Sequence, residues 1–187
     1  MIAIINYIGN IGSVKNALDY LEIPNFIANQ PEQLSDATHI IIPGVGNWTE
    51  GVKKLKPFYK YLKSTNKRIL GICLGFQLLC KLSEEGKGNG LGLIDYDVCD
   101  IGFQHVGWDN IHGKSYYFVH RYGVKSYKFG RFISIYDNKN ITGVQFHPEK
   151  SQQDGLSFLK EWYEASNSSI ITEGRNYCEV GAVYKNS

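Results

Sequence analysis

A short stretch around Cys73 constrains the fold more than any other part of this sequence. Ile69–Ile72 is an apolar run, Gly71 and Gly75 stand two positions either side of Cys73, and Phe76–Leu82 has a helical pattern. This spacing is typical of a nucleophile elbow, a sharp strand-to-helix turn in which a Cβ at either glycine would collide with the reversing chain. The turn would place the Cys73 thiol at a helix N-terminus, where the dipole favours negative charge. A buried structural cysteine between two flexible glycines would show the same pattern, so a catalytic role also requires a general base.

Length and composition favour one domain in the cytoplasm. The 187 residues suffice for the core of a single domain of ordinary size. A formal net charge of +2 does not indicate nucleic acid or an anionic membrane as a partner, and no apolar run is long enough to span a bilayer. Met1–Asn6 lacks the basic segment of a signal peptide and is expected to be a strand. The four cysteines lack C-x-x-C spacing and disulfide density, which predicts reduced thiols.

The first half of the chain alternates predicted strands with predicted helices. The expected strands are residues 2–6, 26–28, 39–42 and 69–72, and the expected helices are residues 14–21 and 49–63. Ser13 is the expected N-cap of the first helix, and Pro57 is expected to interrupt the second. Short apolar strands joined by helices predict an α/β fold with an open, mixed, mostly parallel sheet and helices on both faces. The carboxyl ends of such strands meet at one edge, which would gather Gly9–Asn10, Pro43–Gly46 and Cys73.

The second half changes to shorter β-like runs. Gly86–Gly92 is a glycine-rich loop that lacks the G-x-x-x-x-G-K-[ST] pattern and does not follow a strand, so it is interpreted as a linker turn and not a phosphate cradle. The runs expected to be antiparallel additions to the sheet are residues 94–98, 116–119, 131–135 and 142–146. Residues 156–163 have the pattern of a closing helix. We therefore expect a single domain over residues 1–163, followed by a polar extension, residues 164–187, with no assigned structure.

His147 is the strongest candidate for the base that Cys73 requires. It follows a predicted strand, and Pro148 favours an extended conformation for it. Residues two apart in an extended segment face the same way, so Glu149 can point with His147. A carboxylate beside an imidazole fixes its tautomer and stabilises the imidazolium that forms as a proton moves. The three residues together predict a cysteine nucleophile with a histidine base.

Other interpretations of the histidines are less favoured. Taken alone, the His147–Glu149 segment could also be interpreted as an exposed turn that carries a carboxylate by chance. A metal site is not indicated, because the cysteines are scattered and neither H-x₃-H nor H-E-x-x-H spacing occurs. His39 opens a buried strand and is interpreted as structural, whereas His112 lies in a polar turn and is expected to be solvated.

Six motifs resemble, in order, those of the class I (triad-type) glutamine amidotransferases. The chain is most similar to the glutaminase subunits of imidazole glycerol phosphate synthases, in histidine biosynthesis, from residue 1 to about residue 163. The motifs are Pro43-Gly-Val-Gly46, Gly71-Ile-Cys-Leu-Gly-Phe-Gln77, Gly90-Leu-Gly-Leu-Ile94, His105-Val-Gly-Trp108, Tyr117-Phe-Val-His120 and Gly143-Val-Gln-Phe-His-Pro-Glu-Lys-Ser151. The resemblance implies a flavodoxin-like α/β fold and a glutaminase that uses neither a cofactor nor a metal.

The resemblance also implies roles for individual residues. Cys73 would attack the side-chain amide of L-glutamine, with His147 as general base and then acid, and Glu149 orienting His147. The oxyanion that forms needs N–H donors, and these are expected from Leu74 and from Val45 or Gly46 of the Pro43–Gly46 loop. The residues implied in oxyanion or substrate binding are Gly44, Val45, Gly46, Leu74, Gln77, His120, Arg121 and Tyr122.

A partner protein is expected because ammonia is protonated and lost in open water. A glutaminase that supports synthesis therefore needs an enclosed path to an acceptor site, and one modest domain leaves no recognisable room for that site. The resemblance implies a (β/α)₈-barrel cyclase subunit that forms a heterodimer with this chain. The interface positions it implies are Asn10, Trp108 and Lys150.

Three departures from the family pattern bear on the identity of the partner. The loop Asn6–Ser13 is shorter than usual, Arg121 stands where serine is usual, and the residues after 163 have no counterpart. They leave open a paralogous glutaminase that supplies ammonia to a sugar amidotransferase in surface-polysaccharide biosynthesis. A non-catalytic module with this fold and a thiol hydrolase of another substrate are further alternatives. The intact Cys73, His147 and Glu149 count against a non-catalytic module.

Overall fold

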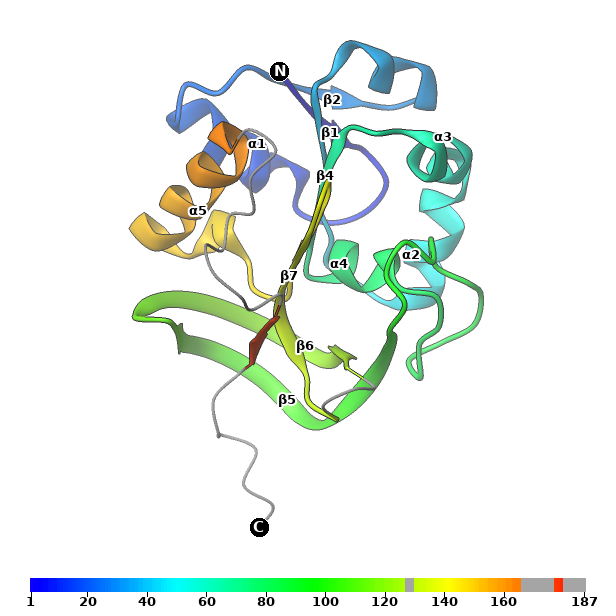
Figure 1. Cartoon of the computed structure of the whole chain (residues 1–187), viewed down its shortest axis with the longest axis vertical. Helices are drawn as coiled ribbons and strands as arrows, with labels where there is room; N and C mark the ends of the chain where they lie inside the picture. The colour runs from blue at the N-terminus through cyan, green and yellow to red at the C-terminus, as the bar shows by residue number, and fades with distance from the viewer. Residues whose placement is uncertain (127–129, 166–176, 180–187) are drawn as a thin grey trace.

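A seven-stranded sheet forms the centre of the molecule, and a separate two-stranded hairpin lies beside it (Figure 1). The computed structural model describes residues 1–126, 130–165 and 177–179. The strands are β1 (Ile2–Ile5), β2 (Asn25–Ala28), β3 (His39–Ile42), β4 (Arg68–Ile72), β5 (Asp97–Ile111), β6 (Lys114–Lys125), β7 (Ile133–Asn138), β8 (Ile141–Val144) and β9 (Tyr177–Glu179). The α-helices are α1 (Ile11–Tyr20), α2 (Trp48–Leu55), α3 (Tyr59–Ser64), α4 (Leu74–Leu79) and α5 (Gln152–Glu164). Short 3₁₀ helices cover Pro31–Asp36, Lys56–Phe58 and Pro148–Lys150.

The strand order in the large sheet is β2-β1-β3-β4-β8-β7-β9. All pairs from β2 across to β8 are parallel, whereas β7 pairs antiparallel with β8 and with β9. This order confirms the predicted open, mixed, mostly parallel sheet. It also makes β4 and β8 direct neighbours, with Ile72 opposite Val144, although they are far apart in sequence.

Helices cover both faces of the sheet because the central strands are apolar at most successive positions. In β1, Ile2 and Ile4 pack in the layer of α1 and α5, whereas Ala3 and Ile5 pack in the layer of α2, α3 and α4 (Figure 1). Successive strand residues point to opposite faces, so only a continuous apolar run can be buried on both. The predicted arrangement of helices on both faces is confirmed.

The helices contain the predicted break, but two of their boundaries differ from the prediction. The break near Pro57 is present, since α2 and α3 are separated by the 3₁₀ turn Lys56–Phe58. The first helix begins at Ile11, so Ser13 lies within it; its N-cap residue is Asn10, whose side chain makes no cap hydrogen bond. The helix after Cys73 is Leu74–Leu79, because Cys80 is already extended.

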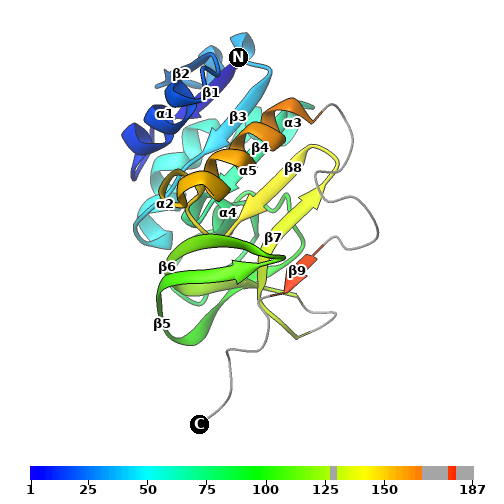
Figure 2. The same cartoon turned by 90° about the vertical axis from the view of Figure 1, so that its left-hand side faces the viewer.

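The prediction for the later strands was wrong in two respects. The run at residues 142–146, expected as an antiparallel addition, contains β8, which pairs parallel with β4. β5 and β6 do not extend the large sheet; they form a long antiparallel hairpin that lies across the carboxyl ends of the central strands (Figure 2). Among the hydrogen bonds that hold the hairpin there, Tyr117 O accepts from His147 N at 2.9 Å, and Ser151 Oγ accepts from Tyr117 N at 3.0 Å. The hairpin therefore closes over the edge where the predicted reactive loops meet.

The extension after the domain is described only in part. Within residues 164–187, β9 forms the last strand of the sheet, and α5 ends at Glu164. The rest of the predicted extension, residues 166–176 and 180–187, lies outside the described residues.

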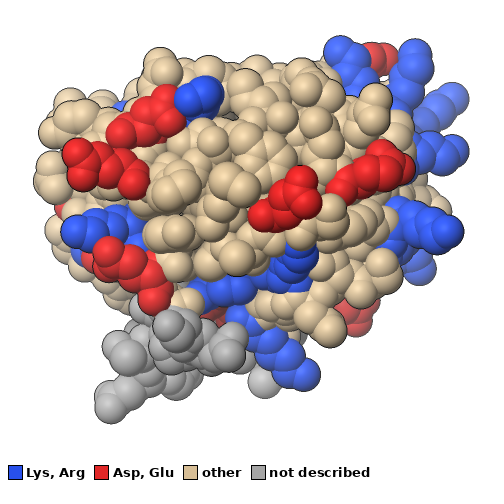
Figure 3. Space-filling view, turned by 90° about the horizontal axis from the view of Figure 1, so that it is seen from above, with Lys and Arg blue, Asp and Glu red and all other residues tan. Residues whose placement is uncertain are grey.

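Basic side chains gather on the outer surface away from the hairpin. Figure 3 shows a cluster of Lys and Arg on the side of the molecule where α2 and α3 lie. The exposed lysines of this region are Lys53, Lys54, Lys56, Lys60 and Lys63. They occupy the solvent side of helices whose other side packs in the core, and acidic residues are interspersed over the rest of that surface (Figure 3). Among the described residues, none of the helices has the length and apolar character needed to cross a bilayer.

Candidate active site

The turn at Cys73 has the strained geometry of a nucleophile elbow. Cys73 joins β4 to α4 with φ 51° and ψ −108°, a conformation that non-glycine residues rarely adopt. An added Cβ at Gly75 would lie 1.8 Å from the Ile42 carbonyl oxygen, and one at Gly71 would lie 2.7 Å from the Gly75 carbonyl oxygen. Both glycines are therefore required by close backbone packing, as the sequence predicted.

His147 and Glu149 form a buried pair beside this turn. His147 follows β8, the strand next to β4, and its Nδ1 lies 2.8 Å from Glu149 Oε1. The side chains are 1% and 0% exposed. Burial alone would lower the pKa of His147, but its interactions with Cys73 and Glu149 outweigh burial and raise that pKa to about 10. Cys73 is thus one of the two groups that act on the ring, and Nε2 of His147 makes no hydrogen bond to a described residue.

Glu149 is held from a second direction by Asn10. Asn10 Nδ2 donates to Glu149 Oε1 at 2.5 Å, the same oxygen that faces His147. Asn10 is half-buried at the start of α1, so a residue that the resemblance placed at the partner interface also contacts the carboxylate predicted to be catalytic. This contact fixes the carboxylate oxygen in line with the imidazole.

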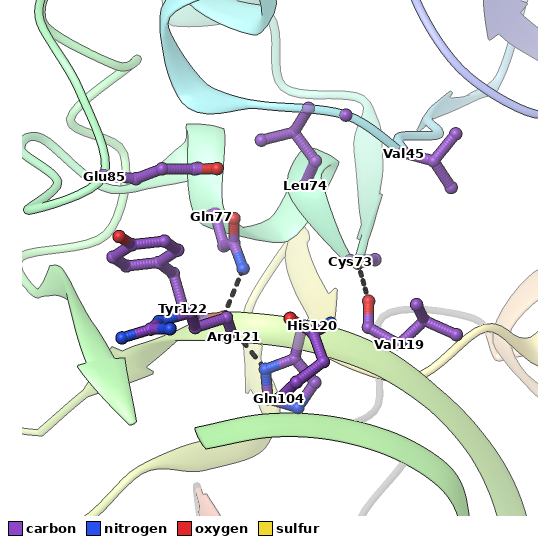
Figure 4. A pocket seen from close by; sticks show the side chains of 11 residues that line it. Val45, Cys73, Leu74, Gln77, Glu85, Gln104, Val119, His120, Arg121 and Tyr122 are labelled. Carbon is purple, nitrogen blue, oxygen red and sulfur yellow. Dashed lines mark hydrogen bonds between the residues drawn. The ribbon is translucent and has the colours of Figure 1, made fainter. Parts of the chain in front are cut away.

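Cys73 opens onto a cavity of about 350 Å³ beneath the hairpin (Figure 4). Its lining residues are Val45, Gly46, Cys73, Leu74, Gln77, Glu85, Gln104, Val119, His120, Arg121 and Tyr122. The sulfur of Cys73 lies 3.8 Å from the carbonyl oxygen of Val119 and accepts from Gln145 Nε2 at 3.6 Å. A small molecule in this cavity would meet the thiol directly.

The Pro43–Gly46 loop packs against the start of α4, as an oxyanion loop must. Val45 and Gly46 line the cavity together with Leu74. Gly44 does not line it; a Cβ there would lie 2.7 Å from Gly75 N, so this glycine allows the loop to approach the helix. Tyr7 donates to the Pro43 carbonyl at 2.5 Å, and burial raises its pKa well above the usual value, so it stays a donor.

The predicted substrate-binding residues Gln77, His120, Arg121 and Tyr122 all line the cavity. Gln77 Nε2 donates to the Tyr122 carbonyl at 2.6 Å, which joins α4 to the hairpin. His120 Nδ1 lies 2.9 Å from the same carbonyl and must be the protonated nitrogen, because a carbonyl only accepts. Burial lowers the pKa of His120 to about 4, so its ring is neutral near pH 7.

Sequence reasoning missed three polar groups of the site. Gln145 lies two residues before His147 in an extended segment, so the same spacing that linked His147 to Glu149 could have found it. Glu85 and Gln104 also line the cavity, but Glu85 comes from the loop just before the linker turn and Gln104 comes from the hairpin. Because neither carries a local pattern, no sequence signal indicated them.

Other predicted residues have the following surroundings. Trp108 lies on the hairpin and is 49% exposed, and Lys150 is exposed in the segment that carries Glu149. His39 is a structural histidine: its ring contacts Trp162 at 5.2 Å, and burial lowers its pKa to about 4. His112 is exposed in the turn between β5 and β6. Within the described ranges, no three His, Cys, Asp or Glu side chains come together as a metal site.

Comparison with known proteins agrees with this geometry. The family model described as glutamine amidotransferase class-I matches residues 3–164. This chain belongs to the class I glutamine amidotransferases.

Similarity to individual relatives assigns the chain to a subgroup of this class. Imidazole glycerol phosphate synthase subunit HisH from Exiguobacterium sibiricum is 38% identical, with 90% of this chain and 97% of that protein covered. Subunit HisH 2 from Methanococcus maripaludis is 36% identical, with 87% and 98% covered. Within the class, the chain groups with these HisH subunits.

Solved structures support the fold independently. A putative GMP synthase protein from Thermoplasma acidophilum has a TM-score of 0.67 at 19% identity, with 86% of this chain and 90% of that chain covered. The glutaminase domain of Trypanosoma brucei CTPS, with bound acivicin, has a TM-score of 0.60 at 16% identity, with 95% and 98% covered. At these identities the similarity concerns the fold alone.

Proposed function

We propose that this chain is the glutaminase subunit of an imidazole glycerol phosphate synthase, which hydrolyses L-glutamine and delivers the ammonia to a cyclase subunit. The observation that carries the proposal is that the buried His147–Glu149 pair interacts with Cys73, whose thiol in turn lines a cavity. The similarity to HisH subunits favours this role over the alternative of a sugar amidotransferase partner. We place the reaction in the cytoplasm, where a catalytic thiol stays reduced.

Acylation uses the groups around the elbow. His147 takes the thiol proton, and the sulfur of Cys73 forms a bond to the amide carbon of glutamine. The carbonyl oxygen becomes an oxyanion, which N–H groups of Leu74 and of the Val45–Gly46 segment would stabilise. The C–N bond then breaks as His147 returns its proton to nitrogen, so that ammonia leaves and a thioester remains. Glu149 holds the imidazolium during both transfers.

Deacylation repeats the sequence with water. His147 removes a proton from a water molecule, whose oxygen attacks the thioester carbon. The C–S bond breaks, glutamate leaves, and the proton returns to the sulfur of Cys73. The same nitrogen of His147 thus acts as base and acid in both halves of the reaction.

The chemical assignment is tested by replacing Cys73 with alanine. We expect glutamate release to fall at least about a thousandfold, because no other group can form the thioester. The fold should survive, because alanine at φ 51° meets the same Cβ penalty as cysteine. Glutamate release and thermal unfolding are measured together, in the presence of the cyclase subunit. Cys99→Ala, at a free cysteine on β5 outside the cavity, is the matched control. Unchanged turnover in Cys73→Ala would disprove the nucleophile.

The hairpin offers an apolar surface for the cyclase partner. Three exposed apolar side chains on the paired strands form what we call the hairpin face: Val106, Trp108 and Val119. Val106 pairs with Val119 across the strands, and Val119 also lines the Cys73 cavity, so this face extends to the cavity. Trp108 adjoins Ser151, next to the other proposed interface residue Lys150. A partner seated here would cover the site from which ammonia leaves.

Trp108→Ala tests the proposed interface. We expect it to weaken binding of the cyclase subunit by about 2 kcal/mol, roughly thirtyfold in Kd, because buried tryptophans dominate interface energy. The stability of the free chain should change little, since the side chain is 49% exposed. Calorimetric titration with the cyclase subunit gives the Kd. Tyr20→Ala, at an aromatic residue 75% exposed on α1, is the control, and equal effects of both variants would contradict the assignment.

A further inference from the structure

Two buried glutamines next to the nucleophile form a chain of hydrogen bonds that ends on its sulfur. Gln77 and Gln145 are 4% and 2% exposed, and their side-chain amides contact each other. Buried amides need protein partners for their N–H and C=O groups, because little water reaches them. The Cys73 sulfur is one of these partners, since Gln145 Nε2 lies 3.6 Å from it.

One carbonyl group on the hairpin decides which way both amides face. Gln77 reaches from α4 towards the hairpin (Figure 4), where the Tyr122 carbonyl, 2.6 Å away, can only accept and so fixes the position of Gln77 Nε2. The same nitrogen lies 3.3 Å from Gln145, so the Gln145 atom that faces it is the oxygen Oε1. The nitrogen of Gln145 is then the atom that faces the sulfur. Cys73 therefore meets an N–H donor and not a second oxygen.

The backbone around Gln145 holds its side chain on the same side as the general base. Gln145 and His147 are two residues apart in the extended segment after β8, so both face the elbow while Phe146 between them points the other way. Phe146 packs on Tyr116 with ring centroids 3.9 Å apart, and Gln145 N donates to the Ser134 carbonyl at 2.9 Å. The segment is thus anchored through its backbone and through its other face.

The remaining groups around the sulfur do not replace this donor. Within the described part of the chain, the other hydrogen bond of the sulfur goes to the Val119 carbonyl at 3.8 Å, which accepts from a thiol but cannot donate to a thiolate. The charged and titratable groups nearby are Tyr7 after β1, Glu85 before the linker turn, His120 and Arg121 on β6, and His147 after β8. Tyr7 and His120 are neutral near pH 7, because burial raises the pKa of Tyr7 well above its usual value and lowers that of His120 to about 4. Arg121 is paired with Asp100.

We infer that Gln145 is a further catalytic residue, whose Nε2–H group stabilises the negative charge on the Cys73 sulfur whenever the thiol has given up its proton. During acylation the S–H bond breaks, the proton goes to His147, and the electron pair stays on a sulfur that already accepts from Gln145. During deacylation the C–S bond breaks and the electron pair returns to the same sulfur. The inference rests on the proposed glutaminase function and adds a side chain to the groups that perform it.

The test measures how the reaction of Cys73 with iodoacetamide depends on pH in the full chain. The thiolate forms a C–S bond and releases iodide, and the modified Cys73 peptide is quantified by mass spectrometry. Gln145→Met keeps the length of the side chain but has no N–H group. We expect it to raise the pH of half-maximal rate by about one unit, because a hydrogen bond to a charged group is stronger than one to a neutral group. The rate at high pH, where the thiol is fully ionised, should not fall.

Gln145→Glu is a second variant that decides the same question. Its carboxylate has the shape of the amide and still accepts from Gln77, but it places negative charge beside the sulfur. The pH of half-maximal rate should therefore rise further, by about two units. With the cyclase subunit present, kcat for glutamate release should fall about tenfold in Gln145→Met and more in Gln145→Glu. Thermal unfolding of each variant is measured alongside.

Thr142→Val is the matched control for a loss of stability. It removes a different buried hydrogen bond from the same part of the chain, that from Thr142 Oγ1 to Asp137, and should leave the pH of half-maximal rate unchanged. If both Gln145 variants keep the wild-type value, or lower only the rate at high pH, the inference is overturned while the glutaminase stands. If the pH of half-maximal rate shifts although the wild type with the cyclase subunit hydrolyses no glutamine, the proposed function fails and the catalytic role of Gln145 falls with it.

Discussion

Replacing His147 with asparagine is expected to lower kcat for glutamate release at least about a thousandfold, with a much smaller change in KM. His147 is the only imidazole paired with a buried carboxylate among the described residues, and its pKa is raised by Cys73 and Glu149. Without it the thiol keeps its proton and the leaving nitrogen receives none. Steady-state kinetics over a range of glutamine concentrations, with the cyclase subunit present, separate the two constants.

His112→Asn is the matched control for this prediction. It makes the same substitution at an exposed histidine with φ 52°, a conformation that asparagine tolerates well. Its kinetics should equal those of the wild type. A loss of less than tenfold in His147→Asn would show that another group serves as the base.

Gly75→Ala is expected to destabilise the domain by about 3 kcal/mol or more. The added Cβ would lie 1.8 Å from the carbonyl oxygen of Ile42 and 2.8 Å from its carbonyl carbon. Both are backbone atoms of β3, so no side-chain rotation relieves the overlap, and α4 must move away from the sheet. Urea denaturation followed by far-UV circular dichroism measures the change in the free energy of unfolding.

Gly12→Ala provides the comparison, because a Cβ at this helical glycine would meet nothing within 4 Å. It should leave stability unchanged or raise it by up to about 1 kcal/mol through helix propensity. If the two alanine variants unfold at the same urea concentration, close packing at the elbow does not limit stability.

Local patterns predicted the parts of the site that depend on neighbours in sequence. Gly71 and Gly75 predicted the elbow, and the extended His147–Glu149 segment predicted the pair, because each is set by backbone geometry over a few residues. Continuous apolar runs predicted the parallel sheet, because a strand buried on both faces needs apolar residues at successive positions.

Contacts between distant segments could not be predicted in this way. Short β-like runs predict strands but not the sheet to which each strand belongs, so β5 and β6 were wrongly added to the large sheet. The hydrogen bond from Asn10 to Glu149 spans 139 positions, and nothing around either residue specifies it. Glu85 reaches the cavity only because its linker folds back onto the start of α2.

The adjacency of β4 and β8 has a consequence for how this chain tolerates change. Cys73 and His147 follow these two strands, with Ile72 opposite Val144, so their separation is set by the spacing of neighbouring strands, about 4.8 Å. The number of residues between Cys73 and His147 does not affect this separation. Insertions and deletions between α4 and β7 can therefore alter the cavity roof while leaving the nucleophile and its base in register. A chimaeric protein that exchanges its hairpin for another should keep the nucleophile and its base in place while the docking surface and the hairpin side of the cavity change.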